Sequence, residues 1–356
     1  MNDRLRELIS SFSKHHIDAF LVTKDINISY LAGFPASESW LLVLPKKTFY
    51  VTDFRYILEA QKGLKGITVK RYTKSFSETI FSIASTHHVK RIGFDDRHVP
   101  LSTFKRLKKS LRKKIKLVAI NGLIENLREI KTKHEIAQIK KALKLNLEAY
   151  AFLKGVIKPG RSEKEVLRKL EQFVRNKNAA FSFPPIIASG PNSCFPHAKV
   201  TDRKIKNNEA VLVDMGMDTG GYKSDLTRIF FLGKIPRQIR EVCAIVYTAQ
   251  KKAISKIKAN VRACEIDYEA RNYIAKNGLG KFFGHSLGHG VGLEIHEGPT
   301  VSQRSPAILK EGMVFTVEPA VYIPNKFGIR IEDMVLVTHD GCEILSSHRD
   351  IDQTCP

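Results

Sequence analysis

Two aspartates lie within strongly apolar segments near the middle of the chain. Asp214 occurs in VLVDMGM and Asp225 in SDLTRIFFL, with the turn-forming residues DTGG between them. If these segments pair as antiparallel strands around a turn centred between Thr219 and Gly220, both carboxylates face the same side. An aspartate is costly to bury in such a strand unless it is ion-paired or binds a metal. Taken alone, the pattern fits two polar residues on an edge hairpin equally well.

The same arrangement recurs toward the C-terminus. Glu318 in MVFTVEPAVYI and Glu332 in GIRIEDMVLVT stand symmetrically about Asn325, which predicts opposed positions across a second hairpin. Four carboxylates facing one cavity would repel one another and become protonated unless cations were present. Two divalent ions would neutralise them almost completely, so the two pairs together indicate a metal site.

Three histidines, His285, His289 and His296, lie between the two acidic pairs in the segment GHSLGHGVGLEIHEGP. The glycines of this segment allow the backbone to approach a buried ion closely. A single histidine here would more often be structural, but three beside two acidic hairpins favour a functional site. The segment lacks the GxGxxG spacing, after a strand and before a helix, of a dinucleotide-binding loop.

The elements that must position these residues divide the chain into two predicted domains, residues 1–125 and 126–356. In the first, an amphipathic helix precedes short β-rich runs separated by helical stretches, which indicates an α/β domain. The runs cover residues 19–22, 40–44, 48–51, 67–70 and 91–94. No cluster of metal ligands is expected in this domain, and its Asp53, Asp95 and Asp96 are interpreted as turn and cap residues.

The second domain opens with two helices whose first turns contain capping boxes. Thr132 with Glu135 forms the first box, and Ser162 with Glu165 forms the second. From Phe181 onward, apolar strands alternate with glycine turns, and further helices are predicted at about residues 237–258 and 266–276. Helices and an antiparallel sheet in one domain predict the α+β class.

The chain of 356 residues carries a formal net charge of +23, which raises nucleic acid or an anionic membrane surface as partners. Its densest basic run, residues 105–116, reads as an amphipathic helix with a solvated lysine face, because Leu107, Leu111 and Ile115 recur at helical spacing. No zinc-finger spacing or ribonucleoprotein motif supports specific nucleic-acid recognition. No apolar run is long enough to predict a membrane span.

Five cysteines occur in the chain, without CxxC spacing and in odd number. This pattern is typical of reduced thiols in a cytosol, so we expect a cytoplasmic protein without structural disulfides. A cysteine hydrolase based on Cys194 and His197 would need a third residue to orient the histidine, and nothing else in the sequence supports one.

The ordered contexts VDMG, SDLTR, GHGVGLEIHE, TVEPA and RIED resemble those of metallopeptidase family M24, which contains methionine aminopeptidase, aminopeptidase P and prolidase. The resemblance spans about residues 126–345. It implies a C-terminal pita-bread domain, with a curved antiparallel sheet backed by helices, and a creatinase-type N-terminal domain over residues 1–125. The implied metal ligands are Asp214, Asp225, His289, Glu318 and Glu332.

Two further positions resemble the proline-specific branch of this family. His197, in SFPPIIASGPNSCFPHAKV, matches a substrate-contacting histidine, and Arg330 matches an arginine that would steady a bridging carboxylate. Ala320 departs from the glycine that often follows Glu-Pro, a change that leaves the ligand set intact. The complete set distinguishes the chain from creatinase, which shares the fold without the metals, and from inactive relatives that serve as binding proteins.

The resemblance implies hydrolysis by a water molecule activated between two divalent ions. Mn²⁺ is the expected metal, with Co²⁺, Zn²⁺ or Fe²⁺ able to substitute, because four carboxylates and one imidazole form a hard site. Glu318 is the expected proton shuttle, while His285 and His296 would contact substrate or the tetrahedral intermediate. The implied ligand roles are Asp214 on one ion, Asp225 and Glu332 bridging both, and His289 with Glu318 on the other.

The expected activity is that of a Xaa-Pro aminopeptidase, which cleaves between an N-terminal residue and a proline. Xaa-Pro dipeptidase (prolidase) is the alternative, because the sequence does not show which loops or neighbouring subunit close the far side of the site. A homodimer is expected by resemblance. An alternative from another functional class is a basic nucleic-acid-binding or scaffold protein built on an inactive peptidase fold. Peptidase activity that EDTA removes and Mn²⁺ restores would distinguish the enzyme from such a binding protein.

Overall fold

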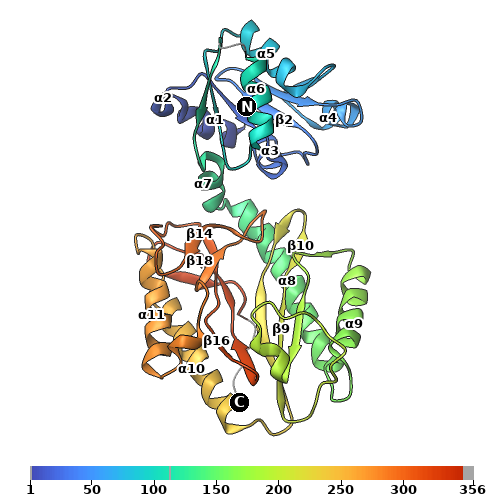
Figure 1. The fold of residues 1–356 in the computed structure, drawn as a ribbon, viewed down its shortest axis with the longest axis vertical. Helices are drawn as coiled ribbons and strands as arrows, with labels where there is room; N and C mark the ends of the chain where they lie inside the picture. The colour runs from blue at the N-terminus through green and yellow to red at the C-terminus, as the bar shows by residue number, and fades with distance from the viewer. Residues whose placement is uncertain (1, 112–113, 348–356) are drawn as a thin grey trace. The chain divides into compact units, whose positions relative to one another are not determined.

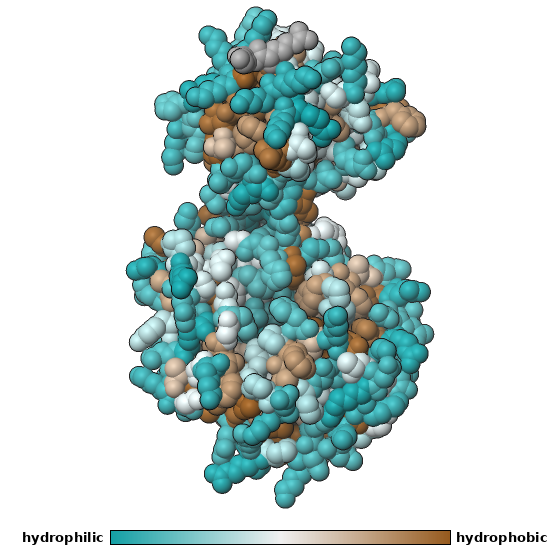
Figure 2. Space-filling view, in the orientation of Figure 1, coloured by the Kyte–Doolittle hydropathy of each residue, from teal (hydrophilic) through white to brown (hydrophobic). Residues whose placement is uncertain are grey.

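The computed structural model describes residues 2–111 and 114–347 of the chain. These residues form two compact units, and the boundary between them falls between Leu127 and Arg128. Hydrophilic residues cover most of the face shown in Figure 2, which agrees with the large share of charged residues in the sequence.

The first unit is built on a six-stranded mixed sheet in the order β4-β3-β2-β1-β5-β6 (Figure 1). Strand β1 pairs in parallel with β5 and antiparallel with β2, and the crossover connections are helices. This confirms the predicted α/β character. The strands are β1 (Ala19–Val22), β2 (Trp40–Val43), β3 (Thr48–Thr52), β4 (Thr68–Arg71), β5 (Arg91–Phe94) and β6 (Lys116–Ala119).

Seven helices accompany this sheet in the described residues. The basic run predicted as one helix through Lys116 is helical only in its first part, because α6 ends at Ser110 and Lys116 begins β6. Leu107, Leu111 and Ile115 are nevertheless all buried. The prediction that these three residues face the core was therefore correct, and the prediction that the helix continues to Lys116 was wrong. The helices are α1 (Asp3–Ser10), α2 (Phe12–His15), α3 (Asp25–Ala32), α4 (Ile57–Gly63), α5 (Phe76–Thr86), α6 (Leu101–Ser110) and α7 (Leu123–Glu129).

In the second unit, strands lie between two pairs of helices, as Figure 1 shows. Helices α8 (Lys133–Val156) and α9 (Glu163–Asn176) form one pair, and α10 (Arg237–Ile254) and α11 (Ala263–Lys276) form the other. Both predicted capping boxes are present at the starts of α8 and α9, where side chain and backbone satisfy each other's hydrogen bonds. Helices α8 and α9 pack against a core that includes Val211, Val213 and Met215, and helices α10 and α11 pack against a separate hydrophobic core.

The strands of the second unit are short and antiparallel. Two three-stranded sheets have the orders β12-β9-β8 and β11-β10-β7, a five-stranded sheet has the order β14-β13-β15-β18-β19, and β16 pairs with β17. The strands are β7 (Ala180–Phe181), β8 (Ile186–Ser189), β9 (Glu209–Met215), β10 (Met217–Thr219), β11 (Tyr222–Lys223), β12 (Leu226–Leu232), β13 (Gly288–Gly290), β14 (Glu297–Val301), β15 (Val314–Val317), β16 (Ala320–Ile323), β17 (Phe327–Arg330), β18 (Asp333–Val337) and β19 (Cys342–Ile344); two 3₁₀ turns are η1 (Gly190–Cys194) and η2 (Gly280–Phe282).

The first acidic hairpin has a different register from the one predicted. Asp214 pairs with Thr227 rather than lying opposite Asp225, and the turn falls at Gly220–Gly221. Both glycines have positive φ, 62° and 84°, which is the conformation that a two-residue hairpin turn requires. The shift is two residues, so both aspartates still lie on one side of the hairpin.

The second acidic hairpin has the predicted register. Val317 pairs with Asp333 in one sheet and Ala320 pairs with Arg330 in the next, both symmetric about Asn325. Glu318 and Glu332 lie between these two ladders, at opposed positions. Asn325 has a φ of 59°, a left-handed conformation that asparagine tolerates well.

The cysteines correct one expectation. Cys194, Cys264 and Cys342 are free, but Cys243 in α10 is disulfide-bonded. The expectation of no disulfide was wrong, because cysteine spacing does not reveal which thiols the fold brings together. Among the described helices, none is both long enough and apolar enough to span a membrane.

Candidate metal centre

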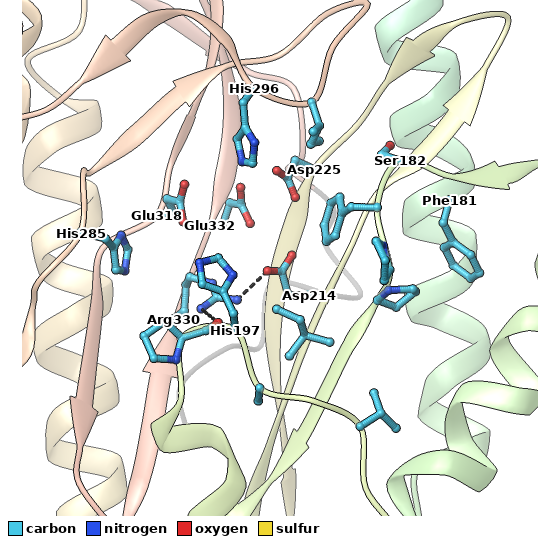
Figure 3. A pocket seen from close by; sticks show the side chains of 18 of the residues that line it. Phe181, Ser182, His197, Asp214, Asp225, His285, His296, Glu318, Arg330 and Glu332 are labelled. Atoms are coloured by element: carbon cyan, nitrogen blue, oxygen red, sulfur yellow. Dashed lines mark hydrogen bonds and ion pairs between the residues drawn. The ribbon is translucent and has the colours of Figure 1, made fainter.

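A pocket of about 1160 Å³ in the second unit contains all of the predicted site residues. In Figure 3, Asp214 and Asp225 approach from one side and Glu318 and Glu332 from the other, and their carboxylates point into a common space. Segments more than a hundred residues apart therefore meet at one place. The predicted site residues among its lining are His197, Asp214, Asp225, His285, His289, His296, Glu318, Arg330 and Glu332.

Three of these side chains are close enough to share a metal ion. Ligand atoms of Asp225, His289 and Glu332 all lie within 4.8 Å of one another. His289 Nε2 is 3.5 Å from Asp225 Oδ2 and 3.4 Å from Glu318 Oε1, so a fourth donor adjoins the group. Two aspartate or glutamate oxygens and an imidazole nitrogen within this distance are suitable for a divalent transition-metal ion.

The two carboxylate oxygens of Asp214 differ in their hydrogen bonding. Its Oδ2 accepts a hydrogen bond of 2.5 Å from Arg330 Nη2. Its Oδ1 is buried, and no group in the described residues hydrogen-bonds to it. Because an orphaned buried carboxylate oxygen is costly, this atom fits the role of a metal ligand.

Arg330 has different partners from those expected for it. It binds Asp214 directly, donates from Nε to Thr227 Oγ1 at 3.1 Å, and also hydrogen-bonds Tyr322. Thr227 in turn donates to Glu332 Oε2 at 2.7 Å. The arginine therefore reaches Glu332, one of the two expected bridging carboxylates, through a threonine.

Three of the carboxylates in the pocket, those of Asp225, Glu318 and Glu332, ionise less readily than usual. Burial raises the pKa of Glu318 to about 8, and it raises the pKa of Asp225 and Glu332 well above the usual range, with a further contribution from the neighbouring acids. Arg330 is the cation that counters these shifts. Divalent ions would supply the missing positive charge, so the residues present fit a metal site.

His289 presents the correct nitrogen to this group. Its Nδ1 lies 3.2 Å from the carbonyl oxygen of Gly290, which favours the tautomer with the proton on Nδ1 and a lone pair on Nε2. Burial, with a smaller contribution from the nearby His296, lowers its pKa to about 4, so the ring is neutral at physiological pH. A neutral imidazole is the form that binds metals.

The glycines on either side of His289 are required by close backbone contacts. A Cβ at Gly288 would lie 1.8 Å from the carbonyl oxygen of Thr316, and one at Gly290 would lie 1.9 Å from that of Gly298. Strand β13 can therefore lie between β14 and β15 only with glycine at these two positions, which is how it brings His289 into the pocket.

The other three histidines surround the carboxylates without joining the close group. His285 lies with Nδ1 2.7 Å from Ser286 O and Nε2 3.4 Å from Tyr322 Oη, and burial lowers its pKa to about 4. The rings of His296 and His289 are 4.3 Å apart, edge to face. His197 is exposed at the edge of the pocket. All three line the pocket.

Sequence reasoning missed the hydroxyl groups that hold the acids in place. Thr227 binds Glu332, and Thr316 donates to Glu318 Oε1 at 3.2 Å while accepting from the His289 N–H at 3.1 Å. Each threonine lies two residues from an acid of the pocket, so strand alternation could have indicated both. Cys194 is buried and is absent from the pocket lining, which leaves the cysteine hydrolase without support.

A second group of metal-binding residue types occurs in the first unit, where none was expected. Ligand atoms of Asp95, His98 and Glu125 lie within 4.8 Å of one another. Arg97 already occupies this group, with 2.6 Å to Asp95 Oδ2 and 3.2 Å to Glu125 Oε2. The expectation missed the proximity because His98 and Glu125 are 27 residues apart in the chain.

The family model for metallopeptidase family M24 matches residues 137–339, and that for the Creatinase/Prolidase N-terminal domain matches residues 4–130. The Xaa-Pro dipeptidase of Pyrococcus furiosus is 37% identical over 349 residues, covering 97% of this chain and 98% of that one. That of Pyrococcus horikoshii is 36% identical, covering 97% of each.

Solved structures match nearly the full length of the chain. The Xaa-Pro dipeptidase from Bacillus anthracis superposes with a TM-score of 0.93 at 34% identity and covers 97% of each chain. The X-Pro aminopeptidase from Thermotoga maritima has a TM-score of 0.88 at 34% identity, covering 97% of this chain and 98% of that one. The predicted fold, a creatinase-type domain followed by a pita-bread domain, is confirmed. The chain belongs to metallopeptidase family M24, a family of metal-dependent hydrolases.

Proposed function

We propose that this chain hydrolyses the peptide bond that precedes a proline, using two divalent metal ions held in the pocket of the second unit. The observation that carries the proposal is the convergence of four carboxylates and one neutral imidazole in one pocket, beside the balancing charge of Arg330. The relatives named as Xaa-Pro peptidases supply the substrate class. The proposed ligands are Asp214, Asp225, His289, Glu318 and Glu332.

Two divalent ions would supply an acidified water nucleophile and an electrophile for the scissile carbonyl. The protein contributes the arrangement of the ligands. Arg330 holds Oδ2 of Asp214 and leaves Oδ1 without a hydrogen-bond partner among the described residues. Thr227 holds Oε2 of Glu332. These contacts limit the rotation of both carboxylates, so the ligand oxygens are in place before an ion binds.

Proton transfer is assigned to Glu318. Its Oε1 lies at the edge of the ligand group, 3.4 Å from His289 Nε2, and Thr316 donates to the same oxygen. A carboxylate placed there can accept a proton from the nucleophile and return it to the departing amine. His296 is a neutral ring at the pocket wall, from which it can donate a hydrogen bond to an oxyanion. His285 is also neutral, but its Nδ1–H faces the Ser286 carbonyl oxygen, so its Nε2 can contact the substrate only as an acceptor.

Recognition of the substrate is assigned to the pocket wall. The lining includes His197 and the adjoining Pro196, together with the apolar residues Phe183, Pro184 and Pro185. An apolar wall with one polar group is the kind of surface that binds a proline ring while orienting the preceding carbonyl.

The range of substrate lengths separates two candidates. A Xaa-Pro aminopeptidase, which the name of the Thermotoga maritima relative favours, would accept peptides longer than a dipeptide. The second candidate is Xaa-Pro dipeptidase, which the names of the Pyrococcus relatives favour. Comparing kcat/KM on Xaa-Pro with that on Xaa-Pro-Yaa tests this directly, since a dipeptidase would not cleave the tripeptide.

The metal requirement is tested by removal and return. Dialysis against EDTA is expected to abolish hydrolysis of Xaa-Pro peptides, and Mn²⁺ is expected to restore it best among Mn²⁺, Co²⁺, Zn²⁺ and Fe²⁺. A peptide with alanine in place of proline serves as the substrate control. Activity that survives EDTA, or equal cleavage of the alanine peptide, would contradict the proposal.

A further inference from the structure

Two side chains of α8 contact every residue that flanks the two aspartates of the pocket. Val213 and Met215 flank Asp214, while Ser224 and Leu226 flank Asp225. Tyr150 contacts Val213 and Leu226, and Asn146 contacts Met215 and Ser224.

Tyr150 links the two strands that carry the aspartates. Its hydroxyl lies 3.0 Å from the carbonyl oxygen of Val213 in β9 and 2.6 Å from that of Leu226 in β12. A hydroxyl has one proton, so the two carbonyls share it. The side chain is fully buried, and its ring stacks on Phe230, with the ring centroids 6.1 Å apart. Neither the hydroxyl nor the carbonyls can turn to water instead.

Asn146, one helical turn earlier in α8, also connects the two segments that carry the aspartates, through the residues Met215 and Ser224. Its Nδ2 donates to Met215 O at 2.8 Å and to Ser224 Oγ at 3.3 Å. Between these contacts the strands approach so closely that a Cβ at Gly216 would lie 1.9 Å from the Ser224 carbonyl oxygen. The spacing of the two strands is therefore set at this point by the helix side chains and the glycine together.

The aspartates lie on the side of the strands opposite to the helix. Val213, Met215 and Leu226 belong to the core that contains Tyr150, whereas Asp214 and Asp225 line the pocket. This follows from the alternation of side chains along a strand. A change at Tyr150 therefore reaches the pocket only through the backbone of β9 and β12.

From this geometry we propose that Tyr150 and Asn146 are positioning residues, which set the separation of Asp214 and Asp225 to the one that a pair of divalent ions requires. The inference rests on the proposed binuclear function. Metal ligands must be placed to within about 0.2 Å, so a small change in the separation of the strands weakens binding of the ion pair before it unfolds the domain. A purely structural role would change stability and leave metal binding unaltered.

The test compares Tyr150→Phe with Tyr222→Phe. Both remove one hydroxyl from a buried tyrosine of the second unit, but the Tyr222 hydroxyl bonds Glu135 Oε1 at 2.9 Å, at the start of α8. Isothermal titration of the metal-free full chain with Mn²⁺, well below the unfolding midpoint, gives the affinity and the number of ions. Electron paramagnetic resonance distinguishes a coupled Mn²⁺ pair from single ions.

Tyr150→Phe is expected to weaken binding of at least one Mn²⁺ by about tenfold, the lower end of the effect of outer-shell partners on metal affinity. It should also convert the coupled resonance signal to that of single ions at limiting metal. Tyr222→Phe should bind Mn²⁺ as the wild type does. If Tyr150→Phe does not fold, Asn146→Ala replaces it with the same expectation.

Identical isotherms and signals for wild type and Tyr150→Phe would overturn the positioning role while leaving the binuclear function intact. An equal loss in both tyrosine variants would show a general effect of stability and would overturn it as well. A wild-type chain that binds no pair of Mn²⁺ ions would overturn the proposed function, and the positioning role with it.

Discussion

The two units each bring carboxylates and a histidine together, but with opposite electrostatic outcomes. In the first unit, Asp95, His98 and Glu125 have ligand atoms within 4.8 Å of one another, and in the second, Asp225, His289 and Glu332 do. By residue type and distance, the two groups are almost equivalent. Their difference lies in the positive charge that surrounds them.

In the first group, Arg97 supplies the positive charge that balances the carboxylates. Burial opposes ionisation of Asp95, but hydrogen bonds from Arg97 and from the Gly122 N–H outweigh it and lower its pKa to about 2. In the second group, burial raises the pKa of Asp225 and Glu332, neighbouring acids raise it further, and Arg330 opposes this without reversing it. Proximity of ligand residues is therefore insufficient to identify a metal site, and the unbalanced charge is the stronger indicator.

The largest expected effect comes from removing a ligand of the second group. Asp225→Ala should abolish the binding of two ions and lower kcat/KM by more than about a hundredfold, because changes to outer partners alone cost up to that much metal affinity. Metal per chain, measured by atomic emission, and peptide hydrolysis report the two effects. Glu125→Ala, the matched change in the first group, should alter neither. Normal metal content in Asp225→Ala would contradict the assignment.

Mn²⁺ should raise the thermal midpoint of the second unit and leave that of the first unchanged. An ion at a hundred times its dissociation constant adds about 2.7 kcal/mol to the free energy of unfolding of the unit that binds it. Calorimetry of the metal-free chain with and without Mn²⁺ measures the shift. Asp95→Asn should show the same Mn²⁺-dependent shift as the wild type. A shift that disappears in Asp95→Asn would place the ion in the first unit.

Thr227→Val should reduce Mn²⁺ affinity by about tenfold, because Glu332 loses its hydrogen bond and Arg330 loses one of its acceptors. Thr227→Ser keeps the hydroxyl and should recover most of the affinity. Titration calorimetry measures both variants. If valine and serine behave alike, the hydroxyl has no part in holding the ligand.

The smallest effect is expected at low pH in the first unit. The pKa of Asp95 is lowered from 3.8 to about 2, so its ionisation stabilises the folded form above pH 3.8 and that contribution is lost as the pH falls through 2. Since Arg97 is half exposed, the contribution is below about 2 kcal/mol. Urea unfolding at pH 5 and pH 2.5 measures it, and Asp95→Asn should lose this part of the pH dependence. An unchanged slope in Asp95→Asn would assign the acid sensitivity to other groups.

Local features of the sequence predicted the elements well because their causes are local. The capping boxes at Thr132 and Ser162, the register around Asn325 and the strands of the first unit depend on neighbours in the chain. The first hairpin was placed two residues off because symmetry between Asp214 and Asp225 was preferred to the turn chemistry of Gly220–Gly221. Glycine pairs with positive φ would have indicated the correct register.

The sequence by itself determined which chemical groups the protein contains and that the acids, lying in apolar strands, must be buried. Only the tertiary structure decided which cation accompanies which acid. Arg97 lies beside Asp95 in the chain and also reaches Glu125, whereas Arg330 binds Asp214, 116 residues away. Electrostatic energy depends on distance in space and on burial, and neither is a function of separation along the chain.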